Sequence, residues 1–577
     1  MRGFSPPSTA RRAGGFVLVA VVVASLLNGT ATGATATERV TSRVRGSDGV
    51  VYTATNHLTV NARSRAYRQY LLTWAGAVTP TSPDFVAVLD ATKGSPGYGR
   101  VLNTVTLGPV LQNEPHHMQY AWHKGDRLYA GGILSDTTYV FDTSRLPLLR
   151  LVGVNTPMDT PCGSAPDAFA TLSDGTAYAS YMGGPNIDGP CQYTNGQIRE
   201  GNGLAGTPGE IVLLGRDGRT IAEIPAAVAG GEPASLCTNF PLMTEASCAN
   251  PHGVSVREDL NLMVASDFAE VRHYFTGGPG DVFDPHLVRN TVRAFDITNR
   301  ANPRMISLSR LPVGPRAPID LLPTFNEPRM VMEIVLTRQR HHKGAFASTM
   351  WGGAIFYTPD ITVPNPQWRE VFDDSTAYRT FNPEGFLMGG GDGGSWLGIS
   401  PDDRFLFHTV IGTQVGIPTE VTRGLVYVLD VRKLIASGSR PRCKIDTMEE
   451  VSYGGNERDC PELADVMPVR DETNGGPHWA AFDNFTRGRD GFFRETNQVE
   501  RLAVANYFVQ PLEFDGNHKV CIVNVDRRGK LSVDRAFRDR VTGEACLDFD
   551  REVWPHGAAG PARPHGVLFA ADPHAIR

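Results

Sequence analysis

The sequence predicts an all-β chain that folds as a seven-bladed β-propeller. Short runs of β-branched and aromatic residues, separated by Gly, Pro, Asn and Asp, follow one another along the chain, and amphipathic helices are hard to find. A second observation is a recurring strand of alternating apolar residues that closes on Asp. It occurs at residues 85–90, 138–142, 292–296, 426–430 and 520–526, with weaker copies at 211–214 and 354–357.

A second strand, which follows a polar turn, precedes several of the Asp-closed strands, as at residues 124–129, 257–262 and 400–405. Such a pair of strands is typical of a propeller blade, and we count about seven units at an irregular spacing of roughly 50 to 90 residues. One blade cannot bury both faces of its sheet alone, so the units must stack around an axis. We therefore expect one domain over residues 37–577; a pair of β-sandwiches is the alternative.

The N-terminus has the order of a secretory signal. Arg11 and Arg12 precede an apolar stretch at residues 16–27, and small residues follow up to Ala36. The stretch is shorter than the roughly 20 residues of a spanning helix. We expect a signal peptide over residues 1–36, a secreted or otherwise extracytoplasmic mature chain, and no membrane contact after cleavage; twin-arginine export is one possible route.

Charge and cysteine content agree with this location. The formal net charge of -6 and the absence of a run of Lys or Arg argue against a nucleic-acid partner. All 8 cysteines follow the predicted signal, so disulfides are expected. Proximity in the sequence suggests Cys162 with Cys191, Cys237 with Cys248, Cys443 with Cys460, and Cys521 with Cys546, although other pairings remain open.

Four histidines share one local context. Each follows a proline at the opening of a predicted first strand: His116, His252, His478 and His565, with His117 next to the first of them. Innermost strands border the central channel, so these side chains should converge on the axis. Neutral imidazole is a common ligand of copper, iron, zinc and nickel. We expect a metal site there, with one of His116 and His117 as a ligand and the other free for a supporting or catalytic role; for any one of these histidines alone, a buried, hydrogen-bonded histidine would be the preferred interpretation.

Carboxylates could complete the site. Glu114 and Asp167 stand at or next to the equivalent position in their units, and a carboxylate often fixes the tautomer of a ligating histidine. A solvated turn residue or strand cap is the alternative for each. The pair His341 and His342 lies in a polar stretch and predicts an exposed loop, whereas the glycines of residues 389–394 are expected to let backbone approach the channel.

Several segments resemble the selenium-binding protein and methanethiol oxidase family. They are residues 84–90, Ser95-Pro-Gly-Tyr98, Glu114-Pro-His-His117, residues 397–406, residues 475–477 and the closing His565. The resemblance implies a seven-bladed propeller that uses copper to convert methanethiol, oxygen and water into formaldehyde, hydrogen sulfide and hydrogen peroxide. It also implies a metal-site role for His116, His117 and His565.

The chain departs from that family at informative positions. The Pro-His-x-x-His motif of the family is replaced by Pro166, Asp167 and Ala170, whereas His252 and His478 stand where relatives carry other residues. Gly99 replaces the cysteine that follows Ser-Pro-x-Tyr, so selenium binding through that thiol is not supported. The rearranged ligand set leaves copper and iron open, since four histidines on a propeller also resemble the iron site of carotenoid-cleaving oxygenases.

These observations predict an exported metal-dependent oxidoreductase, with copper first and iron second, that acts on a small molecule such as methanethiol with oxygen as acceptor. His116, His117, His252, His478 and His565 would hold the metal, and Asp167 and His117 would have catalytic roles. Two alternatives remain: a noncatalytic metal-binding or protein-docking propeller, and a lactonase-type hydrolase that uses calcium or zinc. The sequence gives no prediction for the oligomeric state.

Overall fold

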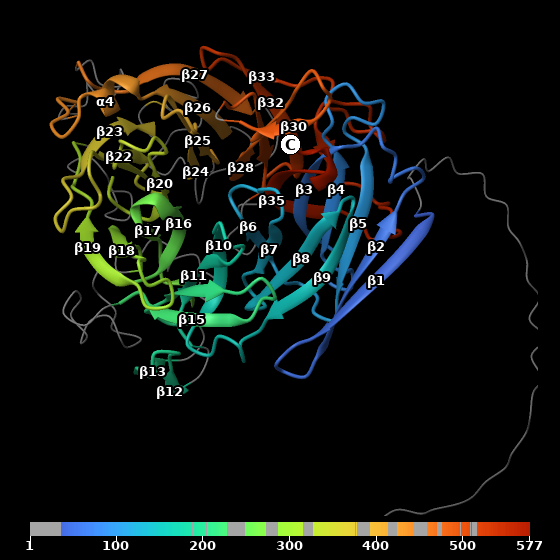
Figure 1. Ribbon diagram of the computed structural model, residues 1–577, viewed down its shortest axis with the longest axis horizontal. Helices are drawn as coiled ribbons and strands as arrows, with labels where there is room; N and C mark the ends of the chain where they lie inside the picture. Colours follow the sequence, from blue (N-terminus) through green and yellow to red (C-terminus); the bar gives the residue numbers. More distant parts are fainter. Residues whose placement is uncertain are drawn as a thin grey trace, which may run out of the picture.

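The protein is a seven-bladed β-propeller. The computed structural model describes residues 36–185, 188–202, 205–227, 248–272, 287–315, 327–374, 377, 393–412, 424–443, 445, 458–469, 476–496, 498–507, 509 and 516–577. Seven antiparallel sheets of four or more strands are arranged around one axis, with β6, β10, β16, β20, β24, β28 and β35 at the centre (Figure 1). The predicted fold class is therefore confirmed.

The blades follow one another along the chain, and the strands of each blade are ordered from the axis outward. The first blade comprises β35 (Ala562–Ala571), β3 (Gln69–Ala77), β4 (Phe85–Asp90), β5 (Val101–Gly108), β2 (Val51–Leu58) and β1 (Glu38–Arg45). The second comprises β6 (Pro115–Met118), β7 (Arg127–Gly132), β8 (Thr137–Arg145) and β9 (Leu148–Asn155). The third comprises β10 (Ser164–Thr171), β11 (Ala177–Gly183), β14 (Glu210–Leu214) and β15 (Thr220–Pro225).

The remaining four blades have the same order. The fourth comprises β16 (Pro251–Arg257), β17 (Leu262–Asp267), β18 (Thr291–Asp296) and β19 (Arg304–Arg310). The fifth comprises β20 (Val331–Leu336), β21 (Ala345–Thr349), β22 (Ala354–Thr358) and β23 (Arg369–Asp373). The sixth comprises β24 (Gly394–Ile399), β25 (Phe405–Val410), β26 (Gly424–Asp430) and β27 (Glu462–Val469). The seventh comprises β28 (Trp479–Phe482), β31 (Arg501–Ala505), β32 (Lys519–Val525) and β33 (Leu531–Val533), and β34 (Leu547–Asp548) also pairs with β32.

Smaller elements decorate the blades. They are the hairpins β12 (Asp188–Gln192) with β13 (Ile198–Asn202) and β29 (Phe485–Arg487) with β30 (Phe493–Glu495), the helix α4 (Arg432–Ala436), and the 3-10 turns η1 (Glu258–Leu260) and η7 (Pro573–Ala575). Among the described residues, no helix is long and apolar enough to cross a membrane.

The Asp-closed strand of the sequence repeat is the third strand of its blade. Its carboxylate ends the strand by accepting a backbone hydrogen bond from two residues further on. Thr92 N donates to Asp90 Oδ1 over 2.9 Å, and Thr298 N donates to Asp296 Oδ1 over 2.9 Å. Such an Asx turn supplies a partner to an N–H group that leaves the ladder, which explains why Asp recurs there.

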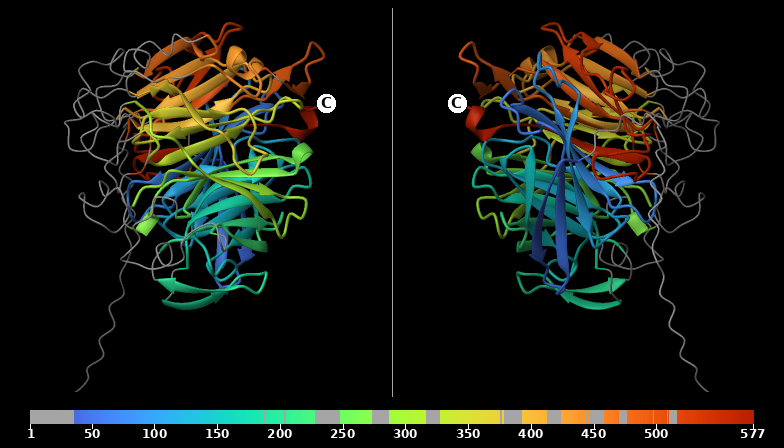
Figure 2. Two further views of the ribbon diagram at one scale, coloured as in Figure 1. Left: turned by 90° about the vertical axis from the view of Figure 1, so that its left-hand side faces the viewer. Right: turned by 90° about the vertical axis from the view of Figure 1, so that its right-hand side faces the viewer.

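The ring is closed by the end of the chain. Strand β35 pairs with β3 from Gln69 opposite Ala571 to Ala77 opposite Ala562, and the register shifts between Trp74 and Ala75, opposite His565. The first blade thus combines the two ends of the described chain, and β1 and β2 extend it outward along one side of the molecule (Figure 2). This closure and the two added strands were not part of the local repeat in the sequence.

Three of the four expected disulfides are confirmed: Cys162–Cys191, Cys443–Cys460 and Cys521–Cys546. They fit an oxidising compartment. Cys237 lies outside the described residues, so its pairing with Cys248 stays a prediction, and Cys248 is disulfide-bonded. Most of the expected signal peptide, residues 1–35, is also outside the described residues.

Candidate metal centre

A β-bulge near the start of the innermost strands positions the axial side chains. The register of the strand with its neighbour shifts between Pro115 and Met118, between Pro166 and Phe169, and between Pro251 and Val254. The residues inside these bulges do not take part in the regular hydrogen-bond pairing of the two strands. A bulge changes the direction in which side chains point. Proline suits the first residue of a strand because it has no N–H to leave unpaired.

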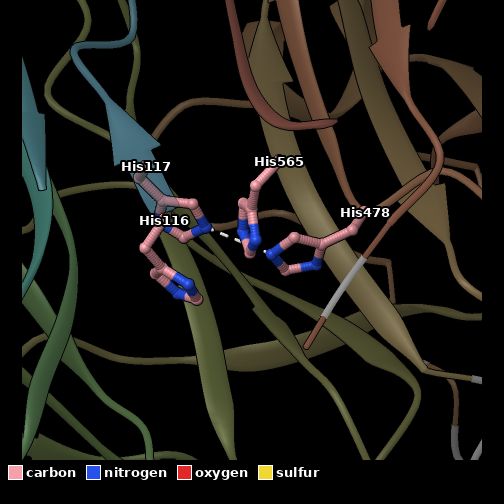
Figure 3. A group of neighbouring side chains, drawn as sticks. All are labelled: His116, His117, His478 and His565. Carbon is pink, nitrogen blue, oxygen red and sulfur yellow. Dashed lines mark hydrogen bonds between the residues drawn. The ribbon is translucent and has the colours of Figure 1, made fainter. Parts of the chain in front are cut away.

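All the histidines predicted for the site meet at the axis and are buried. His116 and His117 come from β6 of the second blade and face His565 of the first blade and His478 of the seventh, which follow one another around the ring (Figure 3). One donor atom from each of these four lies within 4.8 Å of the others, and the same holds for the set of His116, His117, Asp167 and His252. The side chains of His117 and Asp167 are fully buried. The structure thus brings together both His116 and His117, between which the sequence could not choose.

The first set consists of imidazoles only. His117 Nε2 lies 3.1 Å from His478 Nε2, and the ring of His565 is 4.7 Å from that of His478. The hydroxyl of Ser395 donates to the carbonyl oxygen of His478 over 2.9 Å and also bonds with His478 Nδ1. Because that hydroxyl has one proton, its oxygen accepts from Nδ1–H, and His478 Nε2 is then the unprotonated nitrogen that faces His117 Nε2.

The second set contains a carboxylate. Asp167 Oδ1 lies 2.9 Å from His116 Nε2 and 3.2 Å from His117 Nδ1, and Asp167 Oδ2 lies 3.4 Å from His252 Nδ1. Yet neither oxygen of Asp167 accepts a well-aligned hydrogen bond from the described residues, although both lie close to imidazole nitrogens. Atoms bound about 2.0–2.1 Å from one ion lie roughly 2.9–3.4 Å apart, which is the spacing observed here.

Electrostatics keep these groups in the form that binds a cation. Burial lowers the pKa of His117 to about 3 and also lowers the pKa values of His252, His478 and His565. Burial alone would raise the pKa of Asp167, but His117 and His252 hold that pKa well below its ordinary value. Burial thus favours the neutral form of His117, His252, His478 and His565, and Asp167 is the group of this set that carries a negative charge. A buried anion without hydrogen bonds is costly unless a cation compensates it.

Glu333 is a site residue that the sequence analysis missed. It lies in β20 of the fifth blade, and its Oε1 is 3.8 Å from His252 Nδ1. Tyr120 OH donates to its Oε2 over 2.8 Å, whereas Oε1 has no hydrogen-bond partner among the described residues. Burial raises the pKa of Glu333 well above its ordinary value. Glu333 is the third residue of an innermost strand, and this position could have indicated it. The sequence pattern missed it because the residue before it is not proline and it is not itself a histidine.

A small pocket is lined by Pro115, the residue before His116, but by none of the site histidines themselves. Its volume is about 200 Å³, and its lining includes Glu114, Pro115, Tyr507 and Arg563. Tyr507 bonds with Glu114 through its hydroxyl, and its ring lies 5.6 Å from the ring of His565. Burial raises the pKa of Glu114 to about 7. A larger pocket of about 270 Å³, lined by residues of β1, β2, β8 and β9, lies at the outer edge, away from these groups.

The other sequence-predicted features lie where they were expected. His341 is exposed in the loop after β20, and His342 Nδ1 bonds with Asp403 over 2.7 Å, so this pair is not part of the centre. Gly394 begins β24 at the axis, and the neighbouring Ser395 holds His478. Residues 389–392 of the glycine-rich segment lie outside the described residues.

Comparison of the sequence with protein families and with curated proteins finds no match. Solved structures match the fold. A hypothetical selenium-binding protein from Sulfolobus tokodaii is 14% identical with a TM-score of 0.56, over 87% of this chain and 93% of that one. The periplasmic gluconolactonase of Pseudomonas aeruginosa is 13% identical with a TM-score of 0.43, over 87% and 99%. Virginiamycin B lyase from Staphylococcus aureus is 9% identical with a TM-score of 0.33, over 73% and 83%. The likeness extends to the propeller fold alone.

Proposed function

We propose that this chain is an exported, copper-dependent oxidoreductase that acts on a small molecule with oxygen as acceptor. The observation that carries the proposal is the buried imidazole set of His117, His478 and His565. These are neutral ligands, and neither ring nitrogen of His565 has a hydrogen-bond partner among the described residues. An all-histidine set suits a redox metal, with copper first and iron as the alternative. Copper would supply the one-electron chemistry that the reduction of oxygen requires.

The surrounding residues have separate tasks in this proposal. Ser395 fixes the tautomer of His478 so that Nε2 would be the nitrogen that binds a metal, and Trp479 stacks on His117 at 3.9 Å between ring centroids. This packing restricts rotation of the His117 ring. Asp167 holds the negative charge that compensates a cation. His117 contacts Asp167, His478 and Trp479, which supports the role that we propose for it.

The proposed substrate is small because the adjacent pocket is small. A volume of about 200 Å³ is below the roughly 300–1,000 Å³ of drug-sized ligand sites. Tyr507 lies between this pocket and His565, and with its partner Glu114 it could exchange a proton with the substrate. Methanethiol is the first compound to test, on the strength of the family resemblance in the sequence. The three disulfides support export.

Elemental analysis of the exported protein, purified without chelator, tests the proposal. We expect about one copper or iron per chain in the wild type, loss of that metal in His478→Ala, and retention in the control His341→Ala, whose histidine is exposed. The loaded wild type should consume oxygen with methanethiol. A folded wild type that holds no transition metal, or holds it equally in His478→Ala, would contradict the proposal.

A metal-assisted hydrolase is a second candidate, favoured by the carboxylates of Asp167 and Glu333 at the axis. Carboxylates suit zinc or calcium, which activate water without redox chemistry. A wild type that holds zinc or calcium alone and hydrolyses a lactone without consuming oxygen would support this candidate over the oxidoreductase.

A further inference from the structure

The axis carries more ligand-type side chains than one ion needs. Five histidines and two carboxylates meet there, and four protein ligands complete a typical zinc site. The excess originates at β6, where the bulge presents His116 and His117 side by side, with ring centroids 4.3 Å apart.

The polar atoms divide into two groups on the two sides of this pair. His117 Nε2 faces His478 Nε2 at 3.1 Å, on the side of His565. His116 Nε2 faces Asp167 Oδ1 at 2.9 Å, on the side of His252. His117 thus contacts both groups, because its Nδ1 also lies 3.2 Å from Asp167 Oδ1, whereas the Nε2 of His116 faces the carboxylate group.

We propose that the propeller holds two cations: one bound by His117, His478 and His565, and a second bound by His116, Asp167 and His252, with Glu333 as a further ligand. This inference rests on the proposed function, because it takes the first group as the copper site. The second group combines imidazole with carboxylate, which suits a divalent cation of the zinc or iron(II) class better than copper(I).

Unsatisfied buried atoms support the second site independently. Both oxygens of Asp167, Nδ1 of His252 and Oε1 of Glu333 lack hydrogen-bond partners within the described part of the chain. All three side chains are nearly or fully buried. A buried carboxylate oxygen that faces an imidazole nitrogen without bonding to it is a costly arrangement, and one cation between Asp167, His252 and Glu333 would satisfy all of these atoms.

The test reloads chelator-treated full-length protein with one equivalent of Cu⁺ without oxygen and then with Zn²⁺, removes excess metal by gel filtration, reoxidises the copper in air and counts both metals. We expect one copper and one zinc per chain in the wild type. His252→Ala and Glu333→Gln should lower the zinc affinity about tenfold or more and leave the copper(II) electron paramagnetic resonance spectrum unchanged. His478→Ala should lose the copper and keep the zinc. The thermal transitions of the metal-free variants report whether each one folds.

Two control variants match the chemistry of the changes. Glu210→Gln alters another fully buried glutamate whose oxygens lack partners among the described residues, and His57→Ala removes a buried histidine of the first blade; both should keep two cations. A single cation per chain in the wild type, lost in both His252→Ala and His478→Ala, would overturn the second site and leave the proposed function standing. A folded wild type that binds neither metal would contradict both.

Discussion

Asp167 shows how one residue defines the character of the centre. Its neighbours His116, His117 and His252 surround both of its oxygens at 2.9–3.4 Å, and none of these contacts has the alignment of a good hydrogen bond. The sequence placed Asp167 at the axis because it follows a proline at the same point of the repeat as the histidines. Glu333 and Ser395 occupy equivalent positions but follow methionine and glycine, so the same pattern could not find them.

The lowered pKa values predict how copper binding depends on pH. Protons compete with a cation for an imidazole only near and below the pKa of that imidazole, and burial lowers the pKa of His117 to about 3. We therefore expect the copper affinity, measured by chelator competition on the metal-free protein, to change less than about tenfold between pH 7 and 5. Exposed histidines would lose roughly tenfold per pH unit each below about 6.5, and a loss of that size here would contradict the buried, neutral ligand set.

Asp167→Asn tests the charge rather than the shape of this residue. The amide has nearly the same volume but cannot compensate a cation, so we expect the affinity for the second cation to fall about 10- to 100-fold. Metal competition on the purified variant measures this change. The variant should keep the wild-type circular dichroism spectrum, and an unchanged affinity would show that Asp167 is not a ligand.

At the scale of the element, the bulges in the innermost strands direct the site residues toward the axis. Without the extra residues, alternate side chains would point into the blade and away from the channel. The sequence indicated these strands through their prolines, but a bulge depends on the neighbouring strand and could not be read from one strand alone.

Gly253 tests the packing of one bulge. A Cβ at this position would lie 2.7 Å from Glu333 Oε2 and 3.0 Å from Ser266 Oγ, so Gly253→Ala must displace the glutamate. We expect the free energy of unfolding to fall by about 1–3 kcal/mol and the affinity for the second cation to fall with it. Denaturant titration measures the first and metal competition the second.

Gly215→Ala is the matched control. The atom closest to a Cβ added there is Oδ1 of Asp217, at 2.9 Å, and this side chain is exposed and can move. It should differ little from the wild type. Equal effects of the two substitutions would mean that the bulge is not tightly packed.

The whole molecule depends on one non-local connection. The repeat in the sequence predicted blades, yet the pairing of β35 with β3 joins segments almost 500 residues apart, and no local pattern could have shown it. Closure also brings His565 into the centre, so the ligand set exists only in the closed ring. Val567, Leu568 and Phe569 in β35 are buried.

Truncation before residue 562 tests the importance of closure. Each of these three buried side chains contributes about 1.5–3 kcal/mol, against a net stability of about 5–15 kcal/mol for a typical protein. We expect the truncated chain to lose its cooperative thermal transition, whereas full-length His565→Ala, which removes the ligand alone, should keep one. A truncated chain that melts like the wild type would contradict the closed ring.

The position of the metal is the most direct test of the central claim, that the axis of the propeller is a metal centre. Anomalous diffraction from crystals of the copper-loaded protein, recorded on both sides of the copper absorption edge, measures it. We predict a copper peak about 2.0 Å from the nitrogens of His117, His478 and His565. An axis without an anomalous peak, or copper bound only at surface histidines such as His341, would contradict the account.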